Sequence, residues 1–285
     1  MGEDARGLLA RAAQRLAAAG GASPRVDAEL LLAHVLAVPR TRLLLLDGVT
    51  EGSADRFAGL IKRRAQGVPL QHLTGAAPFR HLELAVGPGV FIPRPETELI
   101  IELARGPLMQ AEVVVDLGAG SGAIALAVAN ETSAGRVIAV ERSEAAQSWL
   151  RRNAVSRAEA GDRPIDIVAG DIADPELLTE LSGLTDVVLS NPPYVPAVLQ
   201  NALSTEVAFD PTEAVFAGDD GLALMPALLQ TGARLLRPGG FLAIEHDESH
   251  RDALLSLVTA TGQWHEVADH PDLTGRPRFV TAVRR

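Results

Sequence analysis

Cysteine is absent from the 285-residue chain, which excludes disulfide bonds, thiolate-bound zinc, iron–sulfur clusters and thiol nucleophiles. Aromatic residues make up only 4%, with one tyrosine and two tryptophans. Long apolar runs are missing too, since the four leucines at 43–46 fall far short of the ~20 residues that a membrane span requires. The first twenty residues carry acids where a signal peptide needs bases. We therefore expect a cytoplasmic protein without membrane attachment.

The remaining composition is that of a globular protein, with 47% hydrophobic and 22% charged residues. The net charge of −10 disfavours a general nucleic-acid binder. Residues 1–75 hold ten basic and seven acidic side chains, whereas the rest holds sixteen and twenty-nine. The basic N-terminal part either presents solvated helix faces or docks a charged partner.

The first 73 residues have the apolar spacing of a small helical bundle. Ser23 and Pro24 predict the start of one helix, and Ser53 is the candidate cap of another over 53–66. Residues 74–95 predict a β-hairpin linker that turns at the Gly-Pro-Gly of 87–89.

From residue 112 onwards, short apolar strands alternate with helices of 10–15 residues. This pattern predicts an α/β fold with a doubly wound, mostly parallel sheet. The predicted strands cover 112–118, 136–141, 165–171, 185–190, 241–245 and two β-rich runs at the C-terminus.

A glycine-rich turn follows the first of these strands, at 116–122 (DLGAGSG). Its spacing also fits a dinucleotide-binding loop or a purely structural strand–helix turn. Asp116 stands directly before the glycines, where it would repel a pyrophosphate but attract the ammonium of S-adenosylmethionine. Glu141 ends the next strand and can accept hydrogen bonds from ribose hydroxyls. Asp171 ends the third strand, where it can meet the adenine amino group or cap a helix.

The sequence Asn-Pro-Pro-Tyr follows the fourth strand, at 191–194. The two prolines lack N–H groups, so the loop offers acceptors: the Asn191 side-chain oxygen and the Pro192 carbonyl. Two acceptors can bind both N–H groups of a planar amide or aniline-type nitrogen and aim it at a methyl sulfonium. The Tyr194 ring adds a flat apolar surface to this loop. A Pro-rich turn that merely closes a strand remains the structural alternative.

Taken in order along the chain, these motifs make the sequence resemble the release-factor glutamine methyltransferases, the PrmC/HemK family. The resemblance rests on PLQHLTG at 69–75, FIPRPETE at 91–98, DLGAGSG at 116–122, SNPPYVP at 190–196 and GDDGL at 218–222.

The resemblance implies a Rossmann-like, seven-stranded methyltransferase domain at 96–285 and a helical substrate-docking domain at 1–73. It implies methylation of the glutamine side-chain amide in the Gly-Gly-Gln motif of class 1 peptide-chain release factors, with S-adenosylmethionine as the cofactor and N5-methylglutamine as the product. We expect a monomer with no metal and no stably bound nucleic acid. The implied cofactor-binding residues are Asp116, Leu117, Gly118, Ala119, Gly120, Glu141, Asp171 and Asn191. The implied substrate-binding residues are Asn191, Pro192, Pro193 and Tyr194, of which Asn191, Pro192 and Tyr194 are the catalytic ones.

Two positions depart from the family pattern: Glu141 replaces a common aspartate, and Ile172 stands where some members carry an aromatic. Arg94 and Glu96 belong to a Pro-rich joint at 92–98, where they order this joint around the cofactor, bind the substrate backbone or form a structural ion pair. Glu206, Phe209 and Asp210 are candidates for a wall of the glutamine pocket. His246 and His250 fit a solvated helix start better than a metal site.

Three other functions remain open from the sequence. An adenine-N6 DNA or RNA methyltransferase would share the glycine turn and the Asn-Pro-Pro-Tyr loop, but it should have a basic face. A dinucleotide oxidoreductase would give that loop no role. A catalytically silent binding module would not need Asn191 or the glycines.

Overall fold

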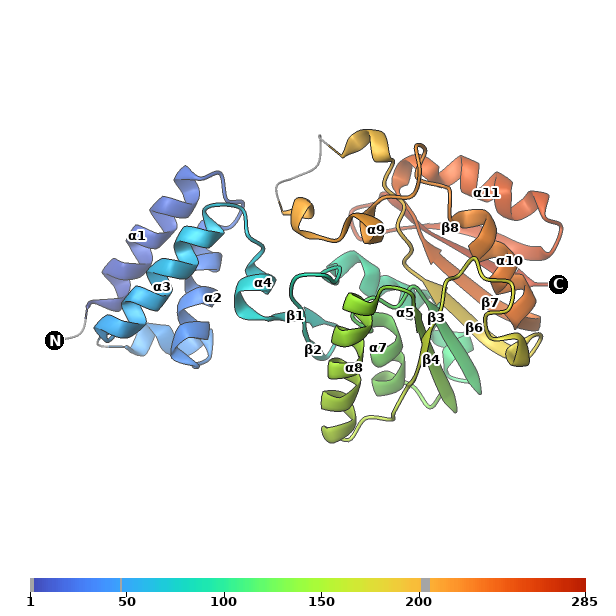
Figure 1. The fold of residues 1–285 in the computed structure, drawn as a ribbon, viewed down its shortest axis with the longest axis horizontal. Coiled ribbons are helices and arrows are strands. Elements are labelled where there is room, and N and C mark those ends of the chain that lie inside the picture. The colour runs from blue at the N-terminus through green and yellow to red at the C-terminus, as the bar shows by residue number, and fades with distance from the viewer. Residues whose placement is uncertain (1–2, 47, 201–205) are drawn as a thin grey trace. The chain divides into compact units, whose positions relative to one another are not determined.

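The computed structural model describes residues 3–46, 48–200 and 206–285 (Figure 1). The chain divides into two compact units, Met1–Ala76 with Ser204–Phe209, and Ala77–Leu203 with Asp210–Arg285. Residues 1–2 and 47 of the predicted helical domain lie outside the described part of the chain. Each unit buries a hydrophobic core of its own.

Helices make up the first unit, as the sequence predicted: α1 (Ala5–Ala18), α2 (Pro24–Leu36), α3 (Glu51–Arg64) and α4 (Leu70–Thr74), with a 3-10 turn at Arg40–Leu45. Asp4 starts α1 by accepting hydrogen bonds from the N–H groups of Arg6 and Gly7. The predicted cap Ser53 is wrong, because α3 starts two residues earlier, directly after Thr50. Ser53 lies inside the helix, where its hydroxyl accepts from Thr50 Oγ1 at 3.1 Å.

An ion-pair cluster lies beside the apolar core of this unit. Arg64 Nε contacts Asp27 Oδ2 at 2.7 Å, and Arg64 Nη2 contacts Glu206 Oε1 at 2.5 Å. The side chains of Arg64 and Asp27 are only about a tenth exposed. Glu206 comes from the segment that follows the Asn-Pro-Pro-Tyr loop, so this pairing attaches that segment to the helical unit.

A short β-hairpin, β1 (Ala76–Phe79) with β2 (Leu82–Ala85), follows the helices. The predicted turn at Gly-Pro-Gly is wrong, since the chain turns at Arg80 and His81 instead. Arg80 takes a φ of +54°, which a non-glycine residue rarely adopts. Its N–H donates to Glu98 Oε1 at 3.0 Å and its guanidinium pairs with Glu131. Glu98 and Glu131 thus stabilise the turn at Arg80, although the residues of the turn itself do not predict one there.

Seven strands of the described residues form one sheet in the order β5-β4-β3-β6-β7-β9-β8. The first five strands in that order run parallel, and β9 runs antiparallel to both β7 and β8. The predicted doubly wound, mostly parallel sheet is thus confirmed. Their bounds are β3 (Val113–Leu117), β4 (Arg136–Glu141), β5 (Asp166–Ala169), β6 (Thr185–Ser190), β7 (Leu236–Glu245), β8 (Trp264–Pro271) and β9 (Pro277–Arg284).

Helices cover both faces of this sheet (Figure 1). One core joins alternate strand residues to the β-hairpin and to α5 (Leu99–Leu103), α6 (Arg105–Leu108), α7 (Ala123–Glu131) and α8 (Glu144–Glu159). The other core packs the opposite strand residues against α10 (Met225–Leu235) and α11 (Arg251–Ala260). A one-turn helix, α9 (Thr212–Val215), precedes α10. None of the described helices is long and apolar enough to cross a membrane.

The strand order reverses between the central strands β3 and β6. The chain starts at β3, moves outward through β4 to β5, and then crosses back to β6 on the other side of β3. Ligands of such sheets bind beyond the carboxyl ends of the strands where this reversal occurs. The glycine turn after β3 and the Asn-Pro-Pro-Tyr loop after β6 leave the sheet at this position.

Candidate active site

The glycine turn joins β3 to α7. Gly118, Gly120 and Gly122 have φ values of +80°, +57° and +89°, which favour glycine. The N–H groups of Gly118 and Ala119 both donate to the Val140 carbonyl at 2.9 Å, which fastens the turn to β4. A Cβ at Gly122 would lie 2.5 Å from Leu150 Cδ1, so only glycine fits there without a shift.

Glu141 ends β4 and holds the glycine turn from the other side. Its Oε2 accepts the N–H of Gly120 at 2.8 Å, and its Oε1 accepts the N–H of Ser143 at 2.8 Å. The residue is 8% exposed. Each carboxylate oxygen has a second lone pair, so these bonds are compatible with the predicted contact to a ribose.

Asp116 lies one residue before the end of β3 and is 1% exposed. Its Oδ2 accepts the N–H of Ala125 at 3.1 Å, whereas its buried Oδ1 has no hydrogen-bonding partner among the described residues. Burial raises the pKa of this carboxyl to about 7; the Ala125 N–H opposes that shift and the charge of Glu141 adds to it. A buried acceptor without a partner is costly, and a cationic ligand would relieve the cost. The site therefore fits the ammonium of S-adenosylmethionine.

Asp171 and Ile172 follow β5. Asp171 Oδ1 accepts the N–H of Ala173 at 2.9 Å, and its Oδ2 pairs with Arg142 at 3.2 Å. The N–H bond and the arginine together lower the pKa of Asp171 against an opposing effect of partial burial. Ile172 is buried, and a Cβ at Gly118 would meet its Cδ1 at 3.6 Å. This geometry places Ile172 beside the glycine turn.

The Asn-Pro-Pro-Tyr loop begins where β6 ends. Ser190 Oγ donates to the Leu117 carbonyl at 2.6 Å, which binds the loop to the end of β3. Pro192 is buried, and Asn191 and Pro193 are partly buried. Asn191 Nδ2 donates to Thr97 Oγ1 at 3.0 Å. The Asn191 side-chain oxygen is thereby presented on the side opposite Thr97.

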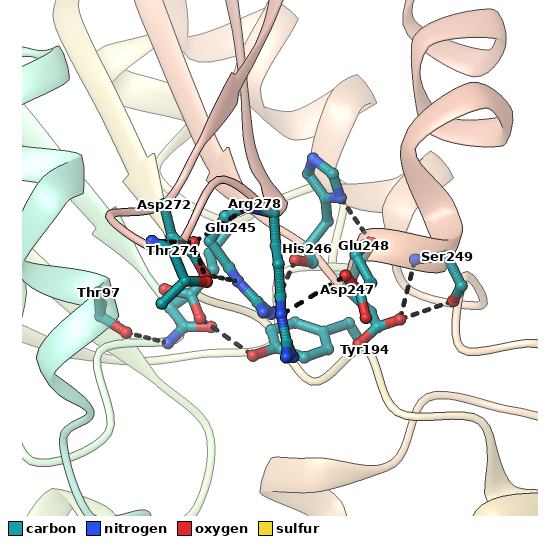
Figure 2. Close-up of polar contacts among 12 residues, drawn as sticks. Thr97, Tyr194, Glu245, His246, Asp247, Glu248, Ser249, Asp272, Thr274 and Arg278 are labelled. Carbon is teal, nitrogen blue, oxygen red and sulfur yellow. Dashed lines mark hydrogen bonds and ion pairs between the residues drawn. The ribbon is translucent and has the colours of Figure 1, made fainter.

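Tyr194 points its hydroxyl toward a buried carboxyl. Its hydroxyl donates to Glu245 Oε1 at 3.0 Å (Figure 2). Burial and the charge of Glu245 raise the pKa of Tyr194 well above its usual value, so the phenol stays protonated and keeps donating. Sequence reasoning missed both Thr97 and Glu245. The signal for Glu245 was an acid at the end of an apolar strand, the same signal that identified Glu141.

The Pro-rich joint before this loop is held by a second ion pair. Arg94 pairs with Asp210, which also accepts the N–H of Ile92 at 3.2 Å. The Arg94 guanidinium lies over the ring of Phe91, 4.9 Å from its centroid. The structure thus places Arg94 in an ion pair, and a role in ordering the segment around the cofactor or in contacting the substrate stays a prediction. Phe209 is 39% exposed in the first unit, and Asp210 is buried in the second.

His246 and His250 are not solvated, contrary to the sequence-based prediction. They are 0% and 5% exposed. His246 Nε2 lies 3.0 Å from Asp269 Oδ1, because the segment after β7 folds back against β8. The described residues include no group of three or more potential metal ligands.

Family models match both parts of the chain. Residues 7–75 match the model described as the PrmC N-terminal domain, and residues 88–208 match the one described as the methyltransferase small domain. The solved hMettl16 catalytic domain has a TM-score of 0.54 and 14% identity, and covers 82% of this chain and 81% of that one. At that identity the likeness supports the methyltransferase fold alone.

Curated proteins match the chain over nearly its whole length. The release factor glutamine methyltransferase of Mycolicibacterium smegmatis is 46% identical and covers 98% of this chain and 97% of its own length. That of Streptomyces coelicolor is 45% identical, with 96% of each covered. Because these alignments cover nearly the whole chain, they include the helical unit as well as the unit that contains the sheet. The chain belongs to the release factor glutamine methyltransferases and is an S-adenosylmethionine-dependent methyltransferase.

Proposed function

We propose that this enzyme methylates the side-chain amide of the glutamine in the Gly-Gly-Gln motif of class 1 peptide-chain release factors, forming N5-methylglutamine in the cytoplasm. One observation carries the proposal. Asn191 is held by Thr97 at the end of β6, directly beside β3 and its glycine turn. An amide acceptor therefore stands next to the predicted cofactor loop.

The loop 191–194 supplies what a poor nucleophile needs. The nitrogen of an amide is weakly nucleophilic because its lone pair is delocalised into the carbonyl. The Asn191 Oδ1 and the Pro192 carbonyl can accept its two N–H groups and fix the direction of the lone pair. The same two oxygens stabilise the positive charge that develops on the nitrogen as it becomes bonded to carbon. No strong base is required, since the proton can leave afterwards.

S-adenosylmethionine, when bound, supplies a methyl group on a sulfonium, and its transfer forms an N–C bond while an S–C bond breaks. The residues proposed to hold this cofactor surround the glycine turn. The unpartnered Asp116 Oδ1 would receive the ammonium, and Glu141 the ribose hydroxyls. Asp171 and Asn191 complete the set with the backbone of Leu117, Gly118, Ala119 and Gly120.

Mass spectrometry of an unmodified class 1 release factor, incubated with the enzyme and S-adenosylmethionine, tests this proposal. We expect one added methyl group, located by peptide fragmentation on the glutamine of the Gly-Gly-Gln motif. The matched control is a release factor in which that glutamine is replaced by glutamate, which keeps the shape but lacks the amide nitrogen. Methyl transfer to another residue, or to DNA or RNA in place of the release factor, would contradict the proposal.

The helical unit is proposed to dock the release factor. Its 3-10 turn, Arg40–Leu45, exposes two adjacent leucines: Leu44 is 69% and Leu45 is 80% exposed. Two neighbouring large apolar side chains in water are typical of an interaction site. Arg42 in the same turn suits an acidic surface on the partner, whereas Arg40 already pairs with Glu29 at 2.7 Å.

Replacing Leu44 and Leu45 together by serine should raise the KM for the release factor about tenfold, because apolar contact area is lost at the interface. Both leucines belong to the helical unit, whereas the glycine turn and the Asn-Pro-Pro-Tyr loop belong to the other, so kcat and the Kd for S-adenosylmethionine should stay unchanged. Steady-state kinetics with a release factor and calorimetry with the cofactor measure the three constants. Leu184→Ser, also at an exposed position (60%) but in the sheet unit, is the control. An unchanged KM would remove this turn from the docking surface.

A further inference from the structure

The sequence Gly-Asp-Asp-Gly-Leu at 218–222 has no part in the proposed mechanism, although it is one of the motifs that relate the chain to its family. It forms the turn between α9 and α10, with φ values of +72° at Gly218 and +78° at Gly221. Asp220 Oδ1 closes the turn by accepting the N–H of Leu222 at 2.9 Å. The Leu222 side chain packs against one of the two cores of the sheet unit, which attaches the turn to the sheet.

The segment that leads into this turn holds the chain that leaves the Asn-Pro-Pro-Tyr loop. The N–H of Val195 donates to the Val215 carbonyl at 2.9 Å, and the N–H of Ala217 donates to the Val195 carbonyl at 3.0 Å. The N–H of Ala197 donates to the Gly218 carbonyl at 2.9 Å. Three backbone hydrogen bonds therefore fix the end of the loop against this segment.

Gly221 lies against the last residue of the loop itself. A Cβ at this position would be 2.2 Å from the Tyr194 carbonyl oxygen and 2.6 Å from Cε1 of His250. Real Cβ atoms essentially never come within 3.0 Å of such neighbours, so a side chain here would have to displace both by a large part of an ångström. The Tyr194 carbonyl belongs to the backbone and cannot rotate away as a side chain can. His250 is 5% exposed and directly precedes α11, so it has little room to move.

A shift at the Tyr194 carbonyl would reach the groups that are proposed to bind the substrate. The two prolines of the loop have fixed φ angles, so few torsions remain between Asn191 and Tyr194 to absorb a displacement. Asn191 is held at one end by Thr97, and the Tyr194 hydroxyl is held at the other by Glu245, each at 3.0 Å (Figure 2). The position of the loop thus depends on the space that Gly221 leaves for its last carbonyl.

We propose that Gly221 is a positioning residue for methyl transfer: its missing side chain lets the Tyr194 carbonyl lie against the turn, which sets the position of the two loop oxygens that accept from the substrate amide. This inference rests on the proposed function, in which those oxygens belong to Asn191 and Pro192. A glycine with a purely structural role would affect the free energy of unfolding and leave the rate of methyl transfer by the folded enzyme unchanged.

Gly221→Ala tests the inference by adding a single methyl group. We expect kcat for the release factor to fall about 10- to 100-fold, because a misplacement of about 1 Å can cost a factor of about 100. The Kd for S-adenosylmethionine should stay within about twofold, since the glycine turn after β3 is fastened by its own bonds to Val140 and Glu141. Single-turnover kinetics and calorimetry measure the two quantities.

Two further variants separate the carbonyl contact from other effects of the methyl group. Gly239→Ala is the matched control for backbone strain, because Gly239 is exposed, has a φ of +77° and lies on β7 far from the carboxyl end of that strand. A Cβ there would meet Arg237 Nη1 at 3.5 Å, an ordinary contact, so its kcat should be that of the wild type. The double variant Gly221→Ala/His250→Ala removes the imidazole and keeps the carbonyl contact. Its kcat should stay as low as that of Gly221→Ala, and a recovered kcat would contradict the inference.

A second measurement follows the carbonyl itself and does not depend on turnover. Tyr194 is the only tyrosine of the chain, so tyrosine labelled with ¹³C at its carbonyl gives one enriched backbone signal. This signal should shift in Gly221→Ala and stay in place in Gly239→Ala. A full-speed Gly221→Ala variant, an unmoved carbonyl signal, or loss of cofactor binding together with activity would overturn the inference. A wild-type enzyme that leaves release factors unmethylated, while the carbonyl signal shifts in Gly221→Ala, would instead refute the proposed function.

Discussion

Replacing Asn191 by alanine should lower kcat for release-factor methylation about 100- to 1000-fold. The substitution removes the side-chain oxygen that the proposed mechanism uses to hold the substrate amide and to stabilise its developing charge. It leaves the glycine turn in place, because the N–H groups that fasten this turn bond to Val140 and Glu141. The Kd for S-adenosylmethionine should change far less than kcat. Single-turnover rates and calorimetry on the same preparation separate the two quantities.

Two companion variants sharpen this prediction. Asn130→Ala removes an exposed asparagine from α7, where its amide donates to Asp162, and should leave kcat unchanged. Asn191→Asp keeps an acceptor oxygen of the same shape but cannot donate to Thr97, so its kcat should lie between those of Asn191→Ala and the wild type. If Asn191→Ala kept kcat within a few-fold of the wild type, the acceptor role of this loop would be disproved.

The central strands β3, β4 and β6 could be predicted because they are mostly buried and therefore form continuous apolar runs. Glycine follows β3 and β5, and β4 and β7 end in an acid, which marks where these strands stop. The hairpin could not be placed in the same way. Its turn residue Arg80 has a left-handed backbone held by Glu98 and Glu131, which lie far along the chain. Local turn chemistry pointed instead to the glycines at 87–89.

In the candidate site, too, some residues could be predicted from local sequence and others depend on contacts between distant segments. Asp116 and Asn191 belong to short motifs whose residue types imply their chemistry. Thr97 lies within the motif at 91–98, but its residue type does not reveal its contact with Asn191, and Glu245 belongs to no motif. Their contacts arise only when the segment 91–98, β6 and β7 come together in the fold. The sequence also could not predict which hydrogen bonds the carboxylates of Glu141 and Asp116 form. Glu141 accepts backbone N–H groups with both of its oxygens, whereas one oxygen of Asp116 has no partner among the described residues.

The Asp116 Oδ1, which has no partner among the described residues, should make the affinity for S-adenosylmethionine depend on pH. The pKa of Asp116 is raised to about 7 by burial, so the free enzyme near neutral pH is a mixture of both protonation states. A cationic ammonium binds the ionised form. The Kd for S-adenosylmethionine should therefore rise as the pH falls below 7, by up to about tenfold per pH unit.

Asp116→Asn should weaken S-adenosylmethionine binding about 10- to 100-fold at pH 8 and remove this pH dependence. The amide keeps an oxygen for the Ala125 N–H, so the end of β3 should hold its shape. Methylthioadenosine, which has the adenosine part but no ammonium, is the matched ligand. Its affinity should be the same in both proteins and independent of pH over this range. Equal losses for both ligands would mean that Asp116 supports the turn and does not contact the ammonium.

The same substitution should have the opposite effect on the ligand-free fold. An aspartate has a pKa of about 3.9 when unfolded, so between about pH 4 and 7 the folded wild type binds more protons than the unfolded chain. Stability contributed by Asp116 therefore falls as the pH rises through that window. The amide introduced by Asp116→Asn does not titrate, so the variant's free energy of unfolding should decline less between pH 5 and 8, as followed by urea denaturation. A variant that lost both stability and affinity in parallel would contradict this interpretation, because a buried carboxylate kept for a cation should cost stability until the cation binds.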